Sequence, residues 1–252
     1  MAVRQIGTGS RPLICTSLTG GDKETIIAEL NQVLKKQPDM IEWRADFFKN
    51  IADIAQVIAV AKLIKEIAGE LPVIFTIRSS REGGQLIALT DREVMELNAE
   101  ICCNTCVEYV DCELSNEPAH IQCLRVEAGK KGIKIIGSYH NFALTPSRDE
   151  LAKKFTTAEQ YGFDVAKVAV MPQDLDDVLR LFGATLEAKK RLSIPLITIS
   201  MGKYGAISRM IGGVFGSSVS FAVGAQASAP GQIPIEDLQT ALDIVEKVIG
   251  EG

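Results

Sequence analysis

Lys167 is the residue whose type and surroundings most directly indicate chemistry. It interrupts the apolar run DVAKVAV (164–170), which is typical of a buried strand, and it shares a face of that strand with Val165 and Ala169. An inward ammonium is costly unless it is paired, and burial or a neighbouring cation such as an arginine lowers its pKa. The resulting neutral amine can attack a ketone and form a Schiff base, so we predict a functional lysine.

The sequence contains only two histidines, His120 and His140, and this number excludes a multi-histidine metal centre. His120 falls in a helical pattern and is predicted to lie on the surface. His140 ends the strand-like run IKIIGSYH (133–140). Imidazole titrates near neutral pH, so His140 is the candidate general acid/base, and Glu82 is the candidate carboxylate that orients it.

Further charged side chains lie near the ends of predicted strands. Glu42 and Arg44 are two residues apart and share a face of their strand. Asp111 and Glu113 form a similar pair, and Arg78 ends another strand. Each of them alone is compatible with a solvated surface charge, because charged residues are mostly exposed. In a closed barrel, however, the strand ends hold the active site, so these positions are candidates for ligand binding.

Eight short β-branched runs alternate with eight longer amphipathic segments. The predicted strands are LICTSL (13–18), MIEWR (40–44), VIFTIR (73–78), VEYVDCEL (107–114), IKIIGSYH (133–140), DVAKVAV (164–170), PLITISM (195–201) and VSFAVG (219–224). The predicted helices cover 23–36, 51–68, 91–104, 117–131, 147–161, 174–192, 204–212 and 235–249.

This alternation predicts an α/β protein with a parallel sheet. Eight units in 252 residues favour a closed (β/α)₈ TIM barrel, a single domain over residues 1–252. An open dinucleotide-binding sheet is disfavoured because TSLTGGDKET (16–25) lacks the G-x-G-x-x-G pattern after the first strand. The turn signal GTGSRP (7–12) predicts a short N-terminal hairpin that closes the bottom of the barrel.

Composition limits the class of partner and the location. Acidic residues outnumber basic ones, 32 to 27, so the chain lacks the basic stripe that nucleic acids require and a small-molecule partner is favoured. The apolar runs are shorter than the roughly 20 residues of a membrane span. The N-terminus also lacks the apolar segment of a secretion signal, so we expect a cytoplasmic protein with no membrane partner.

Six cysteines are expected to be free thiols, because a chain of this size without an export signal has little use for disulfides. Cys102, Cys103 and Cys106 form a local cluster with one C-x-x-C. A closed zinc site needs four ligands, and no second C-x-x-C or histidine pair is present. We therefore predict buried small residues here and no metal.

Several motifs together resemble the type I 3-dehydroquinate dehydratase (3-dehydroquinase) family: EWRAD (42–46), TIRSSREGG (76–84), GSYHNF (137–142), AKVAVMP (166–172), SMGKYGAISR (200–209) and QASAPGQ (226–232). They run through all but the first forty or so residues. The resemblance implies dehydration of 3-dehydroquinate to 3-dehydroshikimate in the shikimate pathway, which supplies aromatic amino acid precursors. It implies an imine intermediate, no metal and no cofactor, and a homodimer.

The resemblance also implies roles for the residues already singled out. Lys167 matches the imine-forming lysine and His140 the general acid/base. Glu82 matches the carboxylate that partners the histidine and favours its tautomer and its cationic form. Arg209 matches the ligand of the substrate carboxylate, a role that suits the bidentate donors of a guanidinium.

The remaining matches concern polar contacts of the substrate. The resemblance assigns substrate hydroxyls and the surrounding charge field to Glu42, Arg44 and Arg78, and polar contacts in a closing loop to Ser228 and Gln232. Asp111 resembles an acid that contacts the substrate-binding side chains and does not itself contact the substrate. Ile199 departs from the family pattern, where methionine is common, which puts the packing against the substrate ring in doubt and leaves the chemical positions unchanged.

Two other functions remain open from the residues. A class I aldolase of phosphorylated sugars would also use a lysine on the sixth strand, but the glycine-rich stretch IGGVFGSS (211–218) precedes the eighth strand, on the face away from the expected phosphate site. A non-catalytic barrel could bind a polyhydroxy acid with the same charges. Lys167 distinguishes a catalytic barrel from a binding barrel, because a protein that only binds its ligand gains nothing from an inward amine.

Overall fold

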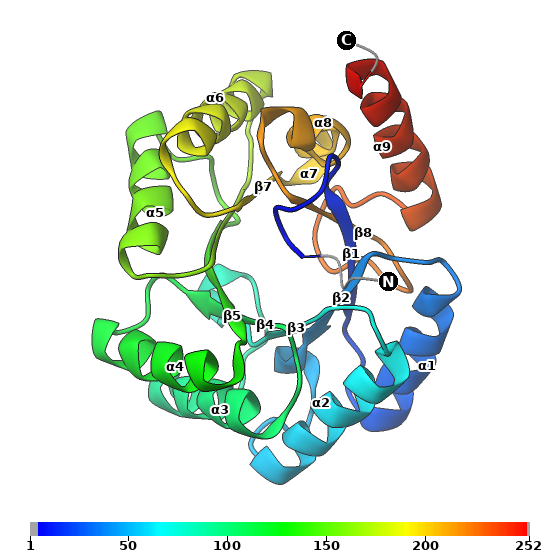
Figure 1. The fold of residues 1–252 in the computed structure, drawn as a ribbon, viewed down its shortest axis with the longest axis vertical. Coiled ribbons are helices and arrows are strands. Elements are labelled where there is room, and N and C mark those ends of the chain that lie inside the picture. The colour runs from blue at the N-terminus through cyan, green and yellow to red at the C-terminus, as the bar shows by residue number, and fades with distance from the viewer. Residues whose placement is uncertain (1–4, 251–252) are drawn as a thin grey trace.

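The computed structural model describes residues 5–250 as a (β/α)₈ barrel, with helices surrounding a ring of strands (Figure 1). The parallel strands follow the order β7-β6-β5-β4-β3-β2-β1-β8. A parallel bridge between Leu196 and Ser217 joins the two edges of this sheet, and the N–H of Ser218 donates to the Leu196 carbonyl at 2.7 Å. These contacts close the barrel, which confirms the predicted fold class.

The strands are β1 (Leu13–Leu18), β2 (Met40–Arg44), β3 (Val73–Thr76), β4 (Tyr109–Glu113), β5 (Lys134–Asn141), β6 (Val165–Val170), β7 (Leu196–Ser200) and β8 (Val219–Ala222). The helices are α1 (Lys23–Leu34), α2 (Ile54–Ala68), α3 (Asp91–Asn104), α4 (Pro118–Lys131), α5 (Arg148–Gln160), α6 (Leu175–Arg191), α7 (Gly202–Gly205), α8 (Ile207–Phe215) and α9 (Ile235–Gly250). Two 3₁₀ turns, η1 (Ala45–Phe47) and η2 (Ser80–Glu82), follow β2 and β3. None of the helices within residues 5–250 is long and apolar enough to cross a membrane.

The interior of the barrel changes from apolar to polar along the strands. Its apolar part includes Cys15, Met40, Ile74, Tyr109, Ile136 and Val165 from β1 to β6. Two residues further along each of these strands, on the same face, a polar side chain is buried: Ser17, Glu42, Thr76, Asp111, Ser138 and Lys167. The strand alternation therefore builds a polar layer directly above the packed apolar layers.

The N-terminal segment reaches the apolar end of this interior. Ile6 is buried in the inner cluster, and its backbone N–H donates to the Tyr109 hydroxyl at 3.0 Å. Residues 5–12 contain turns and bends without a strand. Residues 1–4 of the predicted hairpin lie outside the described part of the chain, so the hairpin stays a prediction.

Two expectations differ from the structure. The single helix predicted at 204–212 is two helices, α7 and α8, separated at Ala206. The cysteine cluster is buried only at Cys102, whereas Cys103 and Cys106 are exposed and the prediction of burial is wrong for them. Successive residues of a helix point about 100° apart, so Cys103 faces away from the core side of α3, and Cys106 follows the end of that helix.

Candidate active site

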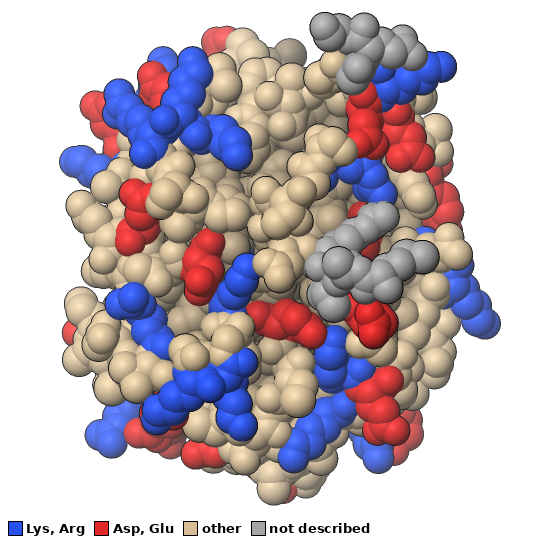
Figure 2. All heavy atoms as spheres, in the orientation of Figure 1, with Lys and Arg blue, Asp and Glu red and all other residues tan. Residues whose placement is uncertain are grey.

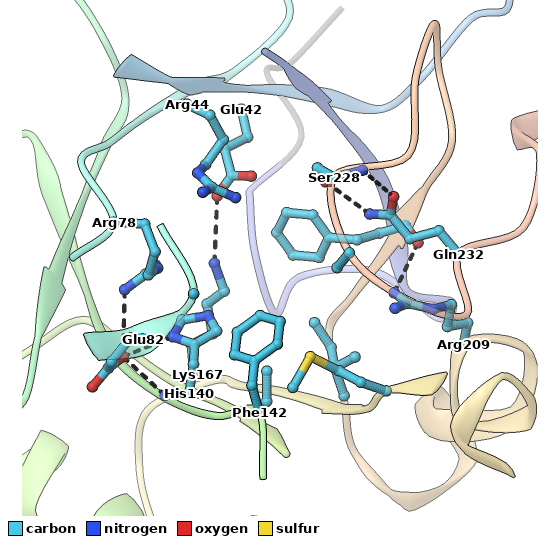
Figure 3. A pocket seen from close by; sticks show the side chains of 16 residues that line it. Glu42, Arg44, Arg78, Glu82, His140, Phe142, Lys167, Arg209, Ser228 and Gln232 are labelled. Atoms are coloured by element: carbon cyan, nitrogen blue, oxygen red, sulfur yellow. Dashed lines mark hydrogen bonds and ion pairs between the residues drawn. The ribbon is translucent and has the colours of Figure 1, made fainter. Parts of the chain in front are cut away.

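A pocket of about 480 Å³ opens at the carboxyl ends of the strands (Figure 3). All nine residues predicted to form the site line it, namely Glu42, Arg44, Arg78, Glu82, His140, Lys167, Arg209, Ser228 and Gln232. Apolar side chains, among them Phe142, Ile199, Met201 and Phe221, complete its wall. The fold therefore brings the predicted residues together, while the role of each stays a prediction.

The Lys167 ammonium lies inside the barrel between two carboxylates. Its Nζ is 3.2 Å from Asp111 Oδ2 and 3.4 Å from Glu42 Oε1, and its side chain is 4% exposed. From the sequence we named burial and a neighbouring cation as influences on this lysine, whereas both of these partners are anionic. The carboxylates compensate the charge of the buried ammonium.

Both carboxylates stay ionised because of the cations around them. Burial alone would raise the pKa of Glu42, but Lys167 and Arg44 outweigh it and hold that pKa below its usual value. Burial opposes ionisation of Asp111 in the same way, and Arg78 and Lys167 lower the Asp111 pKa. The polar layer is thus a network of compensated charges.

Hydroxyl groups of neighbouring strands complete this layer. Ser17 and Thr76 donate to Glu42 at 2.6 and 3.0 Å, and Ser138 donates to Asp111 at 2.6 Å. Each hydroxyl donates to a lone pair of a buried carboxylate oxygen, and that lone pair would otherwise have no hydrogen-bond partner. We did not predict Ser17, although its place on the inward face of the first strand was a signal.

His140 and Glu82 form a hydrogen-bonded pair at the wall of the pocket. Glu82 Oε2 accepts the backbone N–H of His140 at 2.9 Å and lies 2.9 Å from its Nδ1. Glu82 belongs to η2, which ends at Gly83 with a φ of 84°, a backbone conformation that favours glycine. This turn directs the carboxylate back towards β5.

Burial opposes a charge on each member of this pair. It lowers the pKa of His140, and the cationic Arg78 and Lys167 add to this effect. Burial together with the Glu113 carboxylate raises the pKa of Glu82 to about 8. These shifts run against the expectation that Glu82 favours a cationic histidine. A neutral imidazole at this position can accept a proton.

Arg209 is a buried cation without a carboxylate partner among the described residues. It lies in the first turn of α8, and its guanidinium donates to the carbonyl oxygens of Gly231, Phe221 and Pro230 at 2.8, 3.0 and 3.1 Å. Burial lowers the pKa of Arg209 to about 10, which still leaves it charged at neutral pH. An anionic ligand would supply the missing negative charge.

The loop between β8 and α9 covers this part of the pocket. The N–H of Ser228 donates to Gln232 Oε1 at 2.8 Å, and Gln232 Nε2 donates back to Ser228 Oγ at 3.0 Å. The Ser228 hydroxyl also donates to Ser17 at 3.1 Å and so connects the loop to β1. Gly231 has a φ of 75°, and a Cβ there would lie 2.3 Å from the Gly202 carbonyl oxygen. This close approach requires glycine.

The two other arginines of the pocket are fixed by acids outside it. Burial would lower the pKa of Arg78, but Asp111 and Glu113, whose oxygens lie 2.8 and 3.0 Å from its nitrogens, raise it. Arg44 forms a bidentate pair with Asp46, with both distances at 2.8 Å. We assigned no role to Asp46 from the sequence, although it stands only two residues after Arg44 in EWRAD.

The family model described as Type I 3-dehydroquinase matches residues 14–248. The chain belongs to this family. A 3-dehydroquinate dehydratase of Geobacillus sp. (strain WCH70) is 52% identical over 248 residues, which cover 98% of this chain and 95% of that one.

Solved structures of type I 3-dehydroquinases share the fold. The crystal structure of 3-dehydroquinate dehydratase from Geobacillus kaustophilus HTA426 has a TM-score of 0.93 and 47% identity, and the match covers 96% of this chain and 93% of that one. A type I 3-dehydroquinate dehydratase from Clostridium difficile, solved with covalently modified comenic acid, has a TM-score of 0.92 and 37% identity, with coverage of 96% and 95%.

Proposed function

We propose that this type I 3-dehydroquinase dehydrates 3-dehydroquinate to 3-dehydroshikimate in the shikimate pathway, through a Schiff base on Lys167 and with His140 as general acid/base. The observation that carries the proposal is the convergence, in one pocket, of a buried lysine, a histidine–carboxylate pair and an uncompensated arginine. A keto acid needs this combination, because its ketone, its acidic C–H bond and its carboxylate each require a different partner.

The first step is imine formation. Lys167 Nζ loses a proton and forms a C–N bond with the ketone carbon, and the ketone oxygen leaves as water. Glu42 and Asp111 lie close enough to Nζ to accept a proton and to stabilise the positive imine nitrogen that results. The protonated imine then withdraws electrons from the adjacent carbon, which makes its C–H bond acidic.

The second step is elimination. Neutral His140 removes the proton from the carbon beside the imine, the electron pair forms the new C=C bond, and the hydroxyl on the next carbon leaves as water after it receives a proton from the imidazolium. In this step the Glu82 carboxylate accepts the Nδ1–H of the neutral imidazole, so that Nε2 is the nitrogen available for the transfer. Hydrolysis of the imine by water releases the product ketone and restores the lysine.

A direct test is to add 3-dehydroquinate and to follow the absorbance of the conjugated enone, and then to repeat the reaction with borohydride and analyse the protein by mass spectrometry. The proposal predicts enone formation and a reduced adduct that peptide mapping places on Lys167. Binding of the substrate without enone or adduct would leave the non-catalytic barrel as the function. An adduct formed with phosphorylated sugars but not with 3-dehydroquinate would favour an aldolase.

Arg209→Met is expected to lower kcat/KM by roughly 30-fold to several thousand-fold, since loss of a buried charge partner costs about 2–5 kcal/mol. The guanidinium is the proposed ligand of the substrate carboxylate, so the loss should shrink for an analogue that carries a neutral hydroxymethyl group instead. Steady-state kinetics with both substrates measure this difference. Arg148→Met, which removes an exposed arginine paired with Glu187, is the control. Unchanged kinetics in Arg209→Met would contradict the assignment.

A homodimer is proposed for the assembly, and an apolar surface favours it. Exposed hydrophobic side chains at helical spacing lie on the neighbouring helices α6 and α8, namely Leu175, Leu179, Ile207 and Val214. On the face shown in Figure 2, charges of both signs are intermixed and form no continuous basic stripe. We take these hydrophobic side chains as the candidate contact between two copies of the chain. The cytoplasmic location stays a prediction.

Leu179→Glu is expected to weaken dimerisation by at least about tenfold, because the contact would bury an unpaired carboxylate. Sedimentation velocity over a range of concentrations measures the dissociation. Leu86→Glu, at an exposed leucine in the loop before α3, should leave the dimer intact. A wild-type protein that stays monomeric at high concentration would contradict the homodimer.

A further inference from the structure

Asp46 is a buried carboxylate that lies outside the pocket and makes four hydrogen bonds. Its Oδ1 accepts from Arg44 Nε at 2.8 Å and from the backbone N–H of Arg78 at 3.2 Å. Its Oδ2 accepts from Arg44 Nη2 at 2.8 Å and from the backbone N–H of Gln85 at 3.1 Å. The side chain is fully buried. One carboxylate therefore contacts the end of β2 and two points, Arg78 and Gln85, of the loop between β3 and α3.

The bonds to Arg44 fix the plane of its guanidinium. Nε and Nη2 are both held by Asp46, and the guanidinium lies over the Phe47 ring at 5.0 Å from its centroid. Arg44 also lines the pocket beside Glu42 (Figure 3). The donors of Arg44 that Asp46 does not use are thereby placed at the pocket in one orientation.

The backbone bonds fix the loop that carries Glu82. The N–H groups of Arg78 and Gln85 bracket this loop and converge on the same carboxylate. The chain can return so closely only because position 84 is glycine, where a Cβ would lie 1.9 Å from the Arg78 carbonyl oxygen. Glu82 lies between the two ends and holds the His140 imidazole. The position of the acid/base pair thus depends on the loop that Asp46 closes.

We propose that Asp46 is a positioning residue that fixes the substrate-facing Arg44 and the Glu82-bearing loop in one arrangement. A carboxylate is required because four N–H donors surround this position, two at each oxygen. Only a side chain with two acceptor oxygens can accept all four hydrogen bonds. Asparagine would turn an N–H₂ group towards two of these donors. For its kinetic readout the proposal rests on the proposed dehydratase function.

The test is Asp46→Asn, with Glu29→Gln as the matched control. Glu29 is also a buried carboxylate at the carboxyl ends of the strands, and it accepts the backbone N–H groups of Thr19 and Gly20 at 2.8 and 2.9 Å without contacting the pocket. Asp46→Asn is expected to lower kcat at least about tenfold through the displaced acid/base pair, and to raise KM through Arg44. Glu29→Gln should leave both constants near those of the wild type.

The titration of His140 is a second readout. It would not change if Asp46 contributed only to the stability of the fold. The chain has two histidines, so ¹⁵N spectra resolve His140 once His120→Gln has assigned the other signal. A loosened loop admits water, and Asp46→Asn should therefore shift the His140 titration towards the value of a free imidazole, whereas Glu29→Gln should not. An unchanged titration together with unchanged kinetics in Asp46→Asn would overturn the proposal.

Asp46→Glu keeps the proposal testable if the asparagine variant does not fold. It retains the charge and displaces the carboxylate by one methylene group, so folding, checked by circular dichroism, is expected while the positions of Arg44 and Glu82 change. Wild-type kinetics and an unchanged His140 titration in this variant would refute a positioning role. Failure of the proposed function appears separately, as a wild-type protein without enone formation, and the His140 titration still tests Asp46 in that case.

Discussion

Lys167→Met is expected to lower kcat/KM by more than about 10⁴-fold, because it removes the group that forms the imine, and loss of a covalent nucleophile can cost about 10⁶ in kcat. Methionine has nearly the length of lysine, so the packing between Val165 and Ala169 is largely kept. The enone absorbance measures turnover, and mass spectrometry after borohydride treatment should find no adduct. Both signals should disappear together, since both depend on the same amine.

The Lys167→Met experiment needs a check on folding, since Glu42 and Asp111 lose a buried partner, and breaking a buried ion pair costs about 3–5 kcal/mol. Circular dichroism at the assay temperature provides it. Lys203→Met, at an exposed lysine in the segment after β7, is the matched control and should keep activity and adduct. A folded Lys167→Met protein that still turns over substrate would contradict the Schiff-base mechanism.

His140→Ala is expected to separate the two steps of the reaction. General acid–base catalysis contributes about 10²–10⁴-fold, so elimination should slow by that factor, while the amine of Lys167 can still condense slowly with the ketone. The variant should therefore accumulate an adduct that borohydride reduces and that retains the mass of the undehydrated substrate. Intact-protein mass spectrometry distinguishes this adduct from the dehydrated one by the mass of one water.

His120 provides the control for this experiment, because it is the one other histidine of the chain and lies on α4, away from the pocket residues. His120→Ala should behave like the wild type in both turnover and adduct mass. Full activity in His140→Ala would remove this histidine from the mechanism. Loss of the adduct as well as of turnover would instead place its main contribution in imine formation.

Local signals in the sequence predicted most of the fold. The predicted segments 13–18, 40–44 and 91–104 have the bounds of β1, β2 and α3. The bounds of α3 follow from its capping box of Thr90 and Glu93. The start of α2 was predicted three residues early, because Asp53 caps it by accepting the N–H of Gln56 at 3.1 Å.

The end of α8 shows what local signals miss. The predicted helix ended at residue 212, but α8 continues to Phe215. A Cβ at Gly213 would lie 2.5 Å from Pro12 Cγ, so glycine serves the close packing of α8 against the N-terminal segment. Only the assembled barrel shows that contact.

The residue types of the site and the pairing of His140 with Glu82 were predictable, but the partners of Lys167 were not. Strand alternation placed Lys167 inside the barrel, whereas its partners Glu42 and Asp111 are 125 and 56 residues away in sequence. Which charges meet depends on the stagger of strands around the closed barrel, and single-sequence patterns contain no information about it. Asp46 was missed for the same reason, since two of its four hydrogen bonds, those from the backbone N–H groups of Arg78 and Gln85, form only when the end of β2 and the loop after β3 are adjacent.

Under the proposed Schiff-base mechanism, the combination of one lysine with three arginines in the pocket would make the protein open to selective covalent inhibition. An aldehyde or ketone that carries a carboxylate would be attracted by Arg209 before it reaches the amine of Lys167. A compound of this kind would dissociate slowly and reversibly, and its selectivity would come from anion recognition rather than from the intrinsic reactivity of its carbonyl group.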